Sequence, residues 1–100
     1  MAPIKHKLIK DFLTLNELNL LQKYCFNKLE LNKDYVIDNQ SYSPGWYEDP
    51  LMTALLDIKL LNMEKICNLK LSPTYAYWRY YVFGATLQNH KDRKACEISV

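Results

Sequence analysis

Apolar residues recur at spacings of three and four along two stretches of the chain, which is the period of an amphipathic helix. The first stretch begins at Thr14-Leu-Asn-Glu17, a capping box, and predicts a helix over about residues 14–29. The second follows Asp49 and Pro50, a favoured N-cap and first helical residue, and predicts a helix over about 50–68. The apolar stripes consist of Leu18, Leu21, Cys25 and Leu29, and of Leu51, Leu55, Ile58 and Leu61. We expect both helices to buttress a sheet.

The period changes to two over residues 75–82, which are rich in strand-forming residues and predict a strand. One face then carries Tyr75, Tyr77, Arg79 and Tyr81. Two interpretations of Arg79 remain open: it is buried and requires an anionic partner, or it pairs with a glutamate on the sheet surface. Residues 95–100 alternate as well and predict another strand, and residues 3–10 and 35–37 predict two short ones. Together these elements predict an α+β fold.

Residues 31–49 are mostly polar and predict a long irregular segment. Within it, Ser43-Pro44-Gly45-Trp46 predicts a type II turn, because proline suits the first central position and glycine the positive φ of the second. Two interpretations of the nearby aromatic residues remain open. These aromatic side chains either line the mouth of a substrate site or, as we favour, pin the segment to the core. The residues concerned are Tyr42, Trp46 and Tyr47.

Composition narrows the classes of protein to consider. The 100 residues are 49% apolar, which suits one small packed domain. The net charge of +2 comes from scattered residues and does not favour nucleic acid as a partner. Three cysteines lie far apart without a Cys-x-x-Cys pair, and no apolar run reaches membrane-spanning length. We therefore expect no disulfide framework, no membrane span, and a cytoplasmic location.

The triplet His90-Lys91-Asp92 carries the candidate chemistry. In an extended backbone, alternate side chains point the same way, so His90 and Asp92 should project together. An imidazole and a carboxylate are two-thirds of the ligand set of two histidines and one carboxylate that binds non-haem Fe(II). The third ligand would have to come from elsewhere.

The residues around the triplet form the pattern Arg79-x-Tyr81-x-x-Gly84-x-x-Leu87-x-x-His90-x-Asp92-Arg93. This pattern resembles the first metal-binding segment of the prolyl-hydroxylase-like branch of the Fe(II)/2-oxoglutarate-dependent dioxygenases. The resemblance covers the last part of the chain, from Tyr75 onwards. It implies a turn at Gly84, His90 and Asp92 as iron ligands, and a hydrogen bond from Tyr81 to 2-oxoglutarate. Tyr80 is the alternative to Tyr81 if the turn differs by one residue.

The resemblance also implies a fold and a reaction. The fold would be a double-stranded β-helix of the jelly-roll or cupin-like kind, and the cofactors Fe(II) and 2-oxoglutarate, with ascorbate as an optional addition. The reaction would be hydroxylation of a C–H bond in a prolyl or other protein residue. The family's distal histidine and its 2-oxoglutarate-binding Arg or Lys belong to later strands.

The pattern of the last residues indicates whether the predicted oxygenase domain is complete. Residues 96–100 alternate between apolar and polar without a turn signal, so we expect residues 1–100 to be the N-terminal portion of a single oxygenase domain. Alone, this portion would be inactive, and its open sheet edges would favour association with other chains.

Two other functions remain open. In the first, the chain is a non-catalytic structural or interaction module in which His90 bonds Asp92 or a backbone group and no metal binds. In the second, a zinc hydrolase uses His90, Asp92 and Cys96, although this spacing fits no established zinc pattern.

Overall fold

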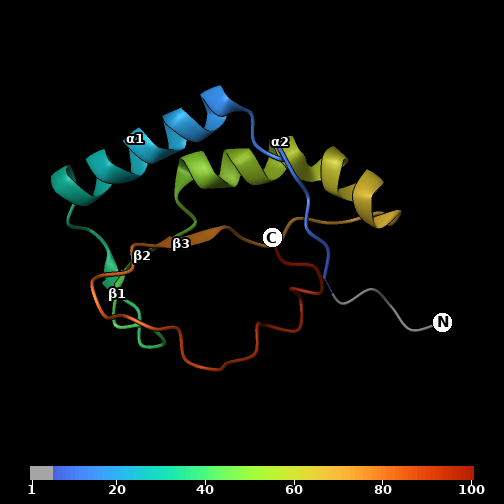
Figure 1. Ribbon diagram of the computed structural model, residues 1–100. Coiled ribbons are helices and arrows are strands. Elements are labelled where there is room, and N and C mark those ends of the chain that lie inside the picture. The colour runs from blue at the N-terminus through green and yellow to red at the C-terminus, as the bar shows by residue number, and fades with distance from the viewer. Residues whose placement is uncertain (1–5) are drawn as a thin grey trace. The chain divides into compact units, whose positions relative to one another are not determined.

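A computed structural model describes residues 6–100 of the chain. The elements are, in order, α1 (Leu15–Leu31), β1 (Val36–Ile37), β2 (Pro44–Tyr47), α2 (Pro50–Cys67) and β3 (Tyr77–Arg79) (Figure 1). The strands form one open antiparallel sheet in the order β1-β2-β3. The chain divides into two compact units, residues 1–33 with α1 and residues 34–100 with the other elements. Two helices and an antiparallel sheet confirm the α+β class.

Helix α1 begins with the predicted capping box. The Glu17 amide donates to Thr14 Oγ1 at 3.1 Å, and the Thr14 amide donates to Glu17 Oε1 at 2.8 Å. These two bonds satisfy donors that the first turn leaves free, so the helix starts where the sequence predicts. Along its predicted stripe, Leu21 and Cys25 are half-buried, whereas Leu18 is exposed.

Helix α2 also begins and ends at local signals. Asp49 Oδ1 accepts from the Leu51 amide at 3.0 Å, and Pro50 occupies the first turn. The helix ends at Asn68, whose φ of 54° is left-handed, a conformation that asparagine tolerates better than most residues. Just beyond the end, Glu64 Oε2 accepts from the Leu71 amide at 2.9 Å. Both predicted helices are therefore confirmed.

Three of the predicted strands, over residues 75–82, 95–100 and 3–10, differ from the structure. The strand expected over 75–82 is shorter, β3, because Tyr80 makes the last backbone bond to β2, through the Pro44 carbonyl at 2.9 Å. The strand expected over 95–100 is wrong: the Cys96 amide bonds the Arg93 carbonyl at 2.8 Å in a local turn. Alternation alone does not supply the partner that a strand needs.

The strand expected over residues 3–10 is wrong for the part that the structure describes. Residues 6–9 are irregular and lead into a turn at Asp11, whose φ is 56°. Residues 3–5 lie outside the described residues. The short strand expected near residues 35–37 is confirmed as β1.

The predicted type II turn at residues 43–46 is also wrong, because Pro44 and Gly45 lie within β2. Gly45 serves a different purpose: a Cβ at this position would collide with the Tyr77 hydroxyl and lie 2.7 Å from Tyr77 Cζ. The chain reverses earlier, where the Tyr42 amide bonds the Asp38 carbonyl and Tyr42 takes a φ of 56°. The glycine is needed for close approach of a ring, not for a turn.

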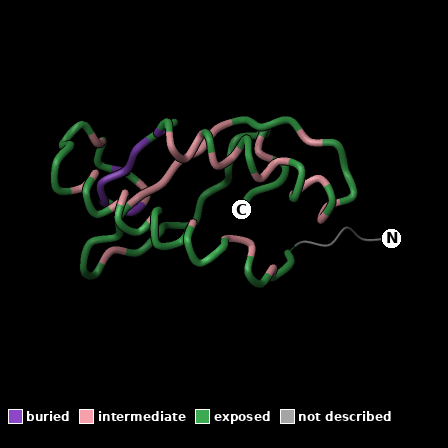
Figure 2. The backbone as a smooth tube through the Cα atoms, turned by 90° about the horizontal axis from the view of Figure 1, so that it is seen from above, coloured by how far each residue is buried: buried purple, intermediate pink, exposed green. Residues whose placement is uncertain are grey.

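The buried core of the described residues centres on Trp46 of β2, which is 5% exposed. Trp46 stacks on Trp78 of β3 with ring centroids 4.3 Å apart. The Tyr35 and Trp46 rings form an edge-to-face pair with centroids 5.2 Å apart. Figure 2 shows the buried positions gathered in one part of the chain, residues 38–49. For Trp46, the interpretation that aromatic residues pin this segment is confirmed. Tyr42 and Tyr47 remain exposed.

Candidate metal site

The segment that carries His90 and Asp92 follows a tight turn at Gly84. The Ala85 amide bonds the Val82 carbonyl at 2.9 Å, and Gly84 takes a φ of 81°, which glycine adopts without steric cost. The predicted glycine turn is therefore confirmed. Beyond it, the Gln88 amide donates to the Gln40 carbonyl at 3.0 Å and ties the segment to the turn after β1.

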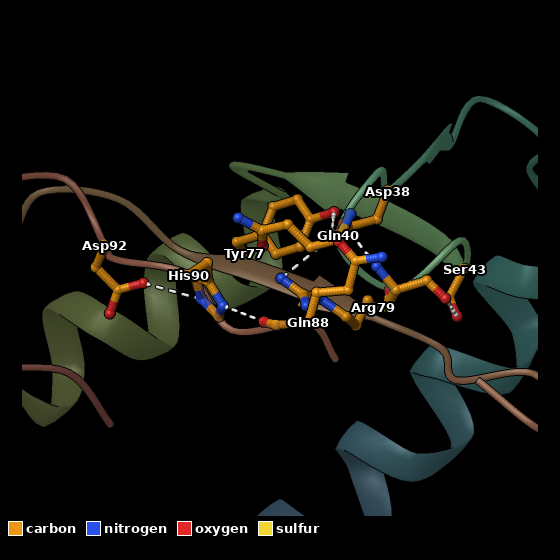
Figure 3. A network of polar contacts seen from close by, with 9 residues as sticks. Asp38, Gln40, Ser43, Tyr77, Arg79, Gln88, His90 and Asp92 are labelled. Atoms are coloured by element: carbon orange, nitrogen blue, oxygen red, sulfur yellow. Dashed lines mark hydrogen bonds and ion pairs between the residues drawn. The ribbon is translucent and has the colours of Figure 1, made fainter. Parts of the chain in front are cut away.

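His90 and Asp92 converge as their spacing predicts. His90 Nε2 lies 3.5 Å from Asp92 Oδ1 (Figure 3). The other ring nitrogen, Nδ1, lies 2.9 Å from the Gln88 carbonyl oxygen. A carbonyl can only accept, so Nδ1 carries the proton and donates, and in the neutral imidazole Nε2 then presents its lone pair. This is the orientation in which a histidine can bind a metal.

The Asp92 carboxylate is held in a complementary way. Its Oδ2 accepts from the Ser99 hydroxyl at 3.2 Å, which leaves Oδ1 directed at His90. Two ligands at right angles on a six-coordinate metal are about 3 Å apart, when each lies about 2.1 Å from the ion. The observed separation of 3.5 Å is close to this, and the side chains are 27% and 50% exposed. Both donors therefore fit Fe(II) in type and in separation.

No third ligand joins them within residues 6–100, where no group of three His, Cys, Asp or Glu side chains is close enough to hold a metal ion. Cys96, the third ligand of the zinc interpretation, instead contacts Thr74 Oγ1 at 3.6 Å. Its thiol also interacts with the Tyr75 hydroxyl, and this hydrogen bond raises the pKa of Tyr75. The described residues thus do not form the predicted zinc set.

Tyr81, the residue predicted to contact 2-oxoglutarate, is 48% exposed and follows β3. It shares a face with Arg79, whose guanidinium carbon lies 5.9 Å from the Tyr81 ring and 5.0 Å from the Tyr77 ring. The predicted common face is confirmed. Among the described residues, no hydrogen bond or ion pair joins Tyr81 to His90 or Asp92. Tyr80, the alternative, is 38% exposed.

Sequence reasoning missed the role of Asp38, which is the anionic partner that Arg79 requires. Its Oδ2 accepts from Arg79 Nη2 at 3.1 Å and from the Tyr77 hydroxyl at 2.8 Å (Figure 3). Its Oδ1 accepts from the Gln40 amide at 2.6 Å and from the Ser41 amide at 3.3 Å. The two amide bonds close a turn of the kind that aspartate favours.

These contacts change the protonation of the cluster. Burial alone would raise the pKa of Asp38, but the bonds from the Gln40 amide and Tyr77 and the charge of Arg79 outweigh burial and lower it below its ordinary 3.8. Burial, followed by the bond to Asp38, raises the pKa of Tyr77 to about 12. The cluster therefore holds an ionised carboxylate and a neutral phenol at neutral pH.

The far end of the His90 segment is anchored by Arg93. Its guanidinium carbon lies 4.8 Å from the Tyr75 ring and 5.4 Å from the Tyr47 ring, and Nη1 donates to the Tyr47 hydroxyl at 3.3 Å. This hydrogen bond raises the pKa of Arg93. Gln88 and Arg93 thus attach the segment on both sides of His90 and Asp92, which positions these two side chains.

Comparisons with protein-family models, with curated proteins and with solved structures found no match for this chain. In the part that the structure describes, neither helix has the length and apolar character required to cross a membrane.

Proposed function

We propose that His90 and Asp92 are two of the iron ligands of a Fe(II)/2-oxoglutarate-dependent dioxygenase that hydroxylates a C–H bond of a prolyl or other protein residue. The observation that carries this proposal is the convergence of His90 Nε2 and Asp92 Oδ1 at 3.5 Å, with the Nδ1 proton committed to the Gln88 carbonyl. With the Nδ1 proton donated to the Gln88 carbonyl, a neutral imidazole presents its Nε2 lone pair towards Asp92, and a cation between them would be attracted by both groups.

The residues of this chain would have separate tasks. His90 and Asp92 would hold the metal, Gln88 would orient the imidazole, and Ser99 would orient the carboxylate. Tyr81 would donate its hydroxyl proton to a carboxylate of 2-oxoglutarate. Bound iron and 2-oxoglutarate would supply the oxidising chemistry. On this proposal, the open sheet is the beginning of a double-stranded β-helix, and the remaining ligands belong to later strands.

Metal binding can be tested on the 100-residue chain by NMR, with Mn(II) as a paramagnetic stand-in for iron. We expect Mn(II) to broaden the amide signals of residues 88–92 first, because a two-ligand site binds weakly but locally. His90→Ala and Asp92→Asn should each abolish this local broadening. The matched control is His6→Ala, since His6 is the other of the two histidines. Unchanged broadening in His90→Ala would refute the assignment.

The assignment of Tyr81 needs a separate measurement. With Mn(II) present, Tyr81→Phe should weaken 2-oxoglutarate binding roughly ten- to a hundredfold, which is the loss of one hydrogen bond to a charged acceptor at about 1.5–3 kcal/mol. Tyr80→Phe is the control and should have little effect. If Tyr80→Phe causes the loss instead, the contact belongs to Tyr80.

A non-catalytic module remains the second candidate, favoured by one observation: His90 already has a partner on each ring nitrogen, Gln88 and Asp92. In that case the pair only stabilises the segment. Mn(II) would then leave residues 88–92 unbroadened, while His90→Ala would still lower the free energy of unfolding.

A further inference from the structure

An open cavity of about 290 Å³ shares Gln88 with the candidate metal site, within the unit formed by residues 34–100. Ser41 and Tyr42 line one side, and residues 82–86 with Gln88 line the other. Gln88 connects the cavity to the metal site, because its carbonyl accepts the His90 Nδ1 proton at 2.9 Å (Figure 3). A group bound in the cavity would therefore contact Gln88, the residue that accepts the His90 proton.

The residues that line the cavity determine what it can bind. None of them is an Asp, Glu, Lys, Arg or His. Val82, Phe83 and Ala85 offer apolar surface, whereas Thr86 and Gln88 offer neutral donors and acceptors. A charged group would find no opposite charge in this lining, whereas it keeps its full hydration in water. An uncharged group with both apolar and hydrogen-bonding parts matches this lining.

Ser41 adds a polar group without a partner. The residue is 2% exposed, and its Oγ forms no hydrogen bond within residues 6–100. An unsatisfied buried hydroxyl costs about 1–3 kcal/mol, a cost that a bound acceptor or donor can remove. Ser41 borders the cavity, and its side chain turns about a single χ1 torsion, so we infer that a rotamer change directs Oγ at a bound group.

We propose that this cavity binds a neutral carboxamide group of the substrate, next to the metal. The inference rests on the proposed function, because it assigns the substrate class of that site. A carboxamide combines a donor and an acceptor without charge, as the lining requires. It could belong to a polypeptide side chain or to a free small amide, and the test separates these two sources.

The test is an NMR titration of the 100-residue chain without metal, using three blocked amino acids as probes: N-acetyl methylamides of glutamine, glutamate and lysine. We expect the glutamine probe to shift the amide signals of residues 41–42 and 82–88, with an affinity at least roughly tenfold above the two charged probes. Equal binding of the three probes, shifts in other residues, or no binding of the glutamine probe would overturn the proposal. Propionamide separates the sources: affinity equal to that of the glutamine probe indicates a free amide, and weaker binding indicates a polypeptide.

Two variants test the cavity itself. Ser41→Ala should weaken the glutamine probe by roughly two- to tenfold, the value of one neutral hydrogen bond, whereas exposed Ser72→Ala should not. Ala85→Leu should weaken it by filling the cavity, which keeps the test decisive if Ser41→Ala disturbs its turn. Unchanged binding in both variants would contradict the proposal. Since the probes are titrated without metal, their binding to the parent chain does not depend on iron, so failure of the iron proposal and failure of this one are distinguishable.

Discussion

Asp38 is the residue at which the polar contacts of the sheet converge, since two backbone amides, a phenol and a guanidinium all donate to its carboxylate. Its side chain is 6% exposed and that of Arg79 is 16% exposed. Among the described residues, Arg79 Nη1 has no hydrogen-bond partner, so Asp38 is the group that compensates this buried charge. Removing one member of a buried pair is far more costly than the pair itself is stabilising.

We therefore expect Asp38→Asn to lower the free energy of unfolding by about 3 kcal/mol, because it leaves the Arg79 charge without its partner. Urea denaturation followed by circular dichroism measures this. Asp57→Asn on the exposed side of α2 is the control and should change stability by less than about 0.5 kcal/mol. Equal effects of the two substitutions would mean that the ion pair contributes no stability.

The lowered pKa of Asp38 also predicts a pH dependence. Because the folded pKa lies below the ordinary 3.8, the stabilisation by the ionised carboxylate is fully present above pH 3.8. It is lost as the pH falls through the lower folded value. Stability measured from pH 5 downwards should therefore fall less steeply in Asp38→Asn than in the parent chain.

Tyr77 should show the opposite pH behaviour. Its folded pKa of about 12 lies above the ordinary 10.0, so its contribution to stability is complete below pH 10 and is lost as the pH rises towards 12. Phenolate absorbance should show one tyrosine ionising about two pH units above the ordinary value, and Tyr77→Phe should remove that late step. A late step that persists in Tyr77→Phe would assign it to another tyrosine.

At the scale of the elements, the two glycines have different purposes. Gly45 lies in β2 beneath the Tyr77 ring, with an extended backbone that any residue can adopt. Gly84 has a φ of 81°, but a Cβ there would meet no atom within 4 Å. One glycine is required by space and the other by backbone conformation.

This contrast predicts how the two alanine variants differ. Gly45→Ala should cost about 1–3 kcal/mol by displacing a ring that is held by Asp38, and the cost should largely vanish when Tyr77 is also replaced by alanine. Gly84→Ala should cost about 1–2 kcal/mol whatever residue 77 is, because its cost is strain at positive φ. A double-mutant cycle by chemical denaturation measures both. A cost at Gly45 that is independent of residue 77 would contradict the close-approach explanation.

At the scale of the whole molecule, much apolar surface remains exposed. Val36 and Ile37 of the edge strand β1 are 73% and 55% exposed, and Phe83 is fully exposed. Unpaired strand edges and exposed apolar side chains are the surfaces through which chains associate.

We therefore expect the 100-residue chain to self-associate through β1. Sedimentation velocity should show the weight-average mass rising with concentration above the 11.9 kDa of one chain. Val36→Lys, a charge on the edge strand, should shift the chain towards monomer. The control is Ile58→Lys, which places a charge at an exposed residue outside the sheet. It should shift the chain towards monomer less than Val36→Lys does if the strand edge is responsible. Monomeric behaviour of the parent chain at all concentrations would contradict this prediction.

The sequence by itself determined the features that depend on neighbouring residues. Both helices begin at caps whose partners lie two or three positions away, so their starts could be read from Thr14 and Asp49. His90 and Asp92 lie two positions apart and approach to 3.5 Å, as alternation along an extended segment predicts. These interactions join residues that are close in the sequence, so they form without contacts from distant segments.

Only the tertiary structure decided the features that depend on distant residues. Asp38 meets Tyr77 and Arg79 across the sheet, and Gly45 is required by a ring 32 positions later in the chain. The predicted strand at 95–100 failed for the same reason, because a strand exists only where another segment pairs with it. Periodicity shows which face of a segment is apolar. Which other segment covers that face depends on long-range pairing, and a local sequence pattern does not determine this pairing.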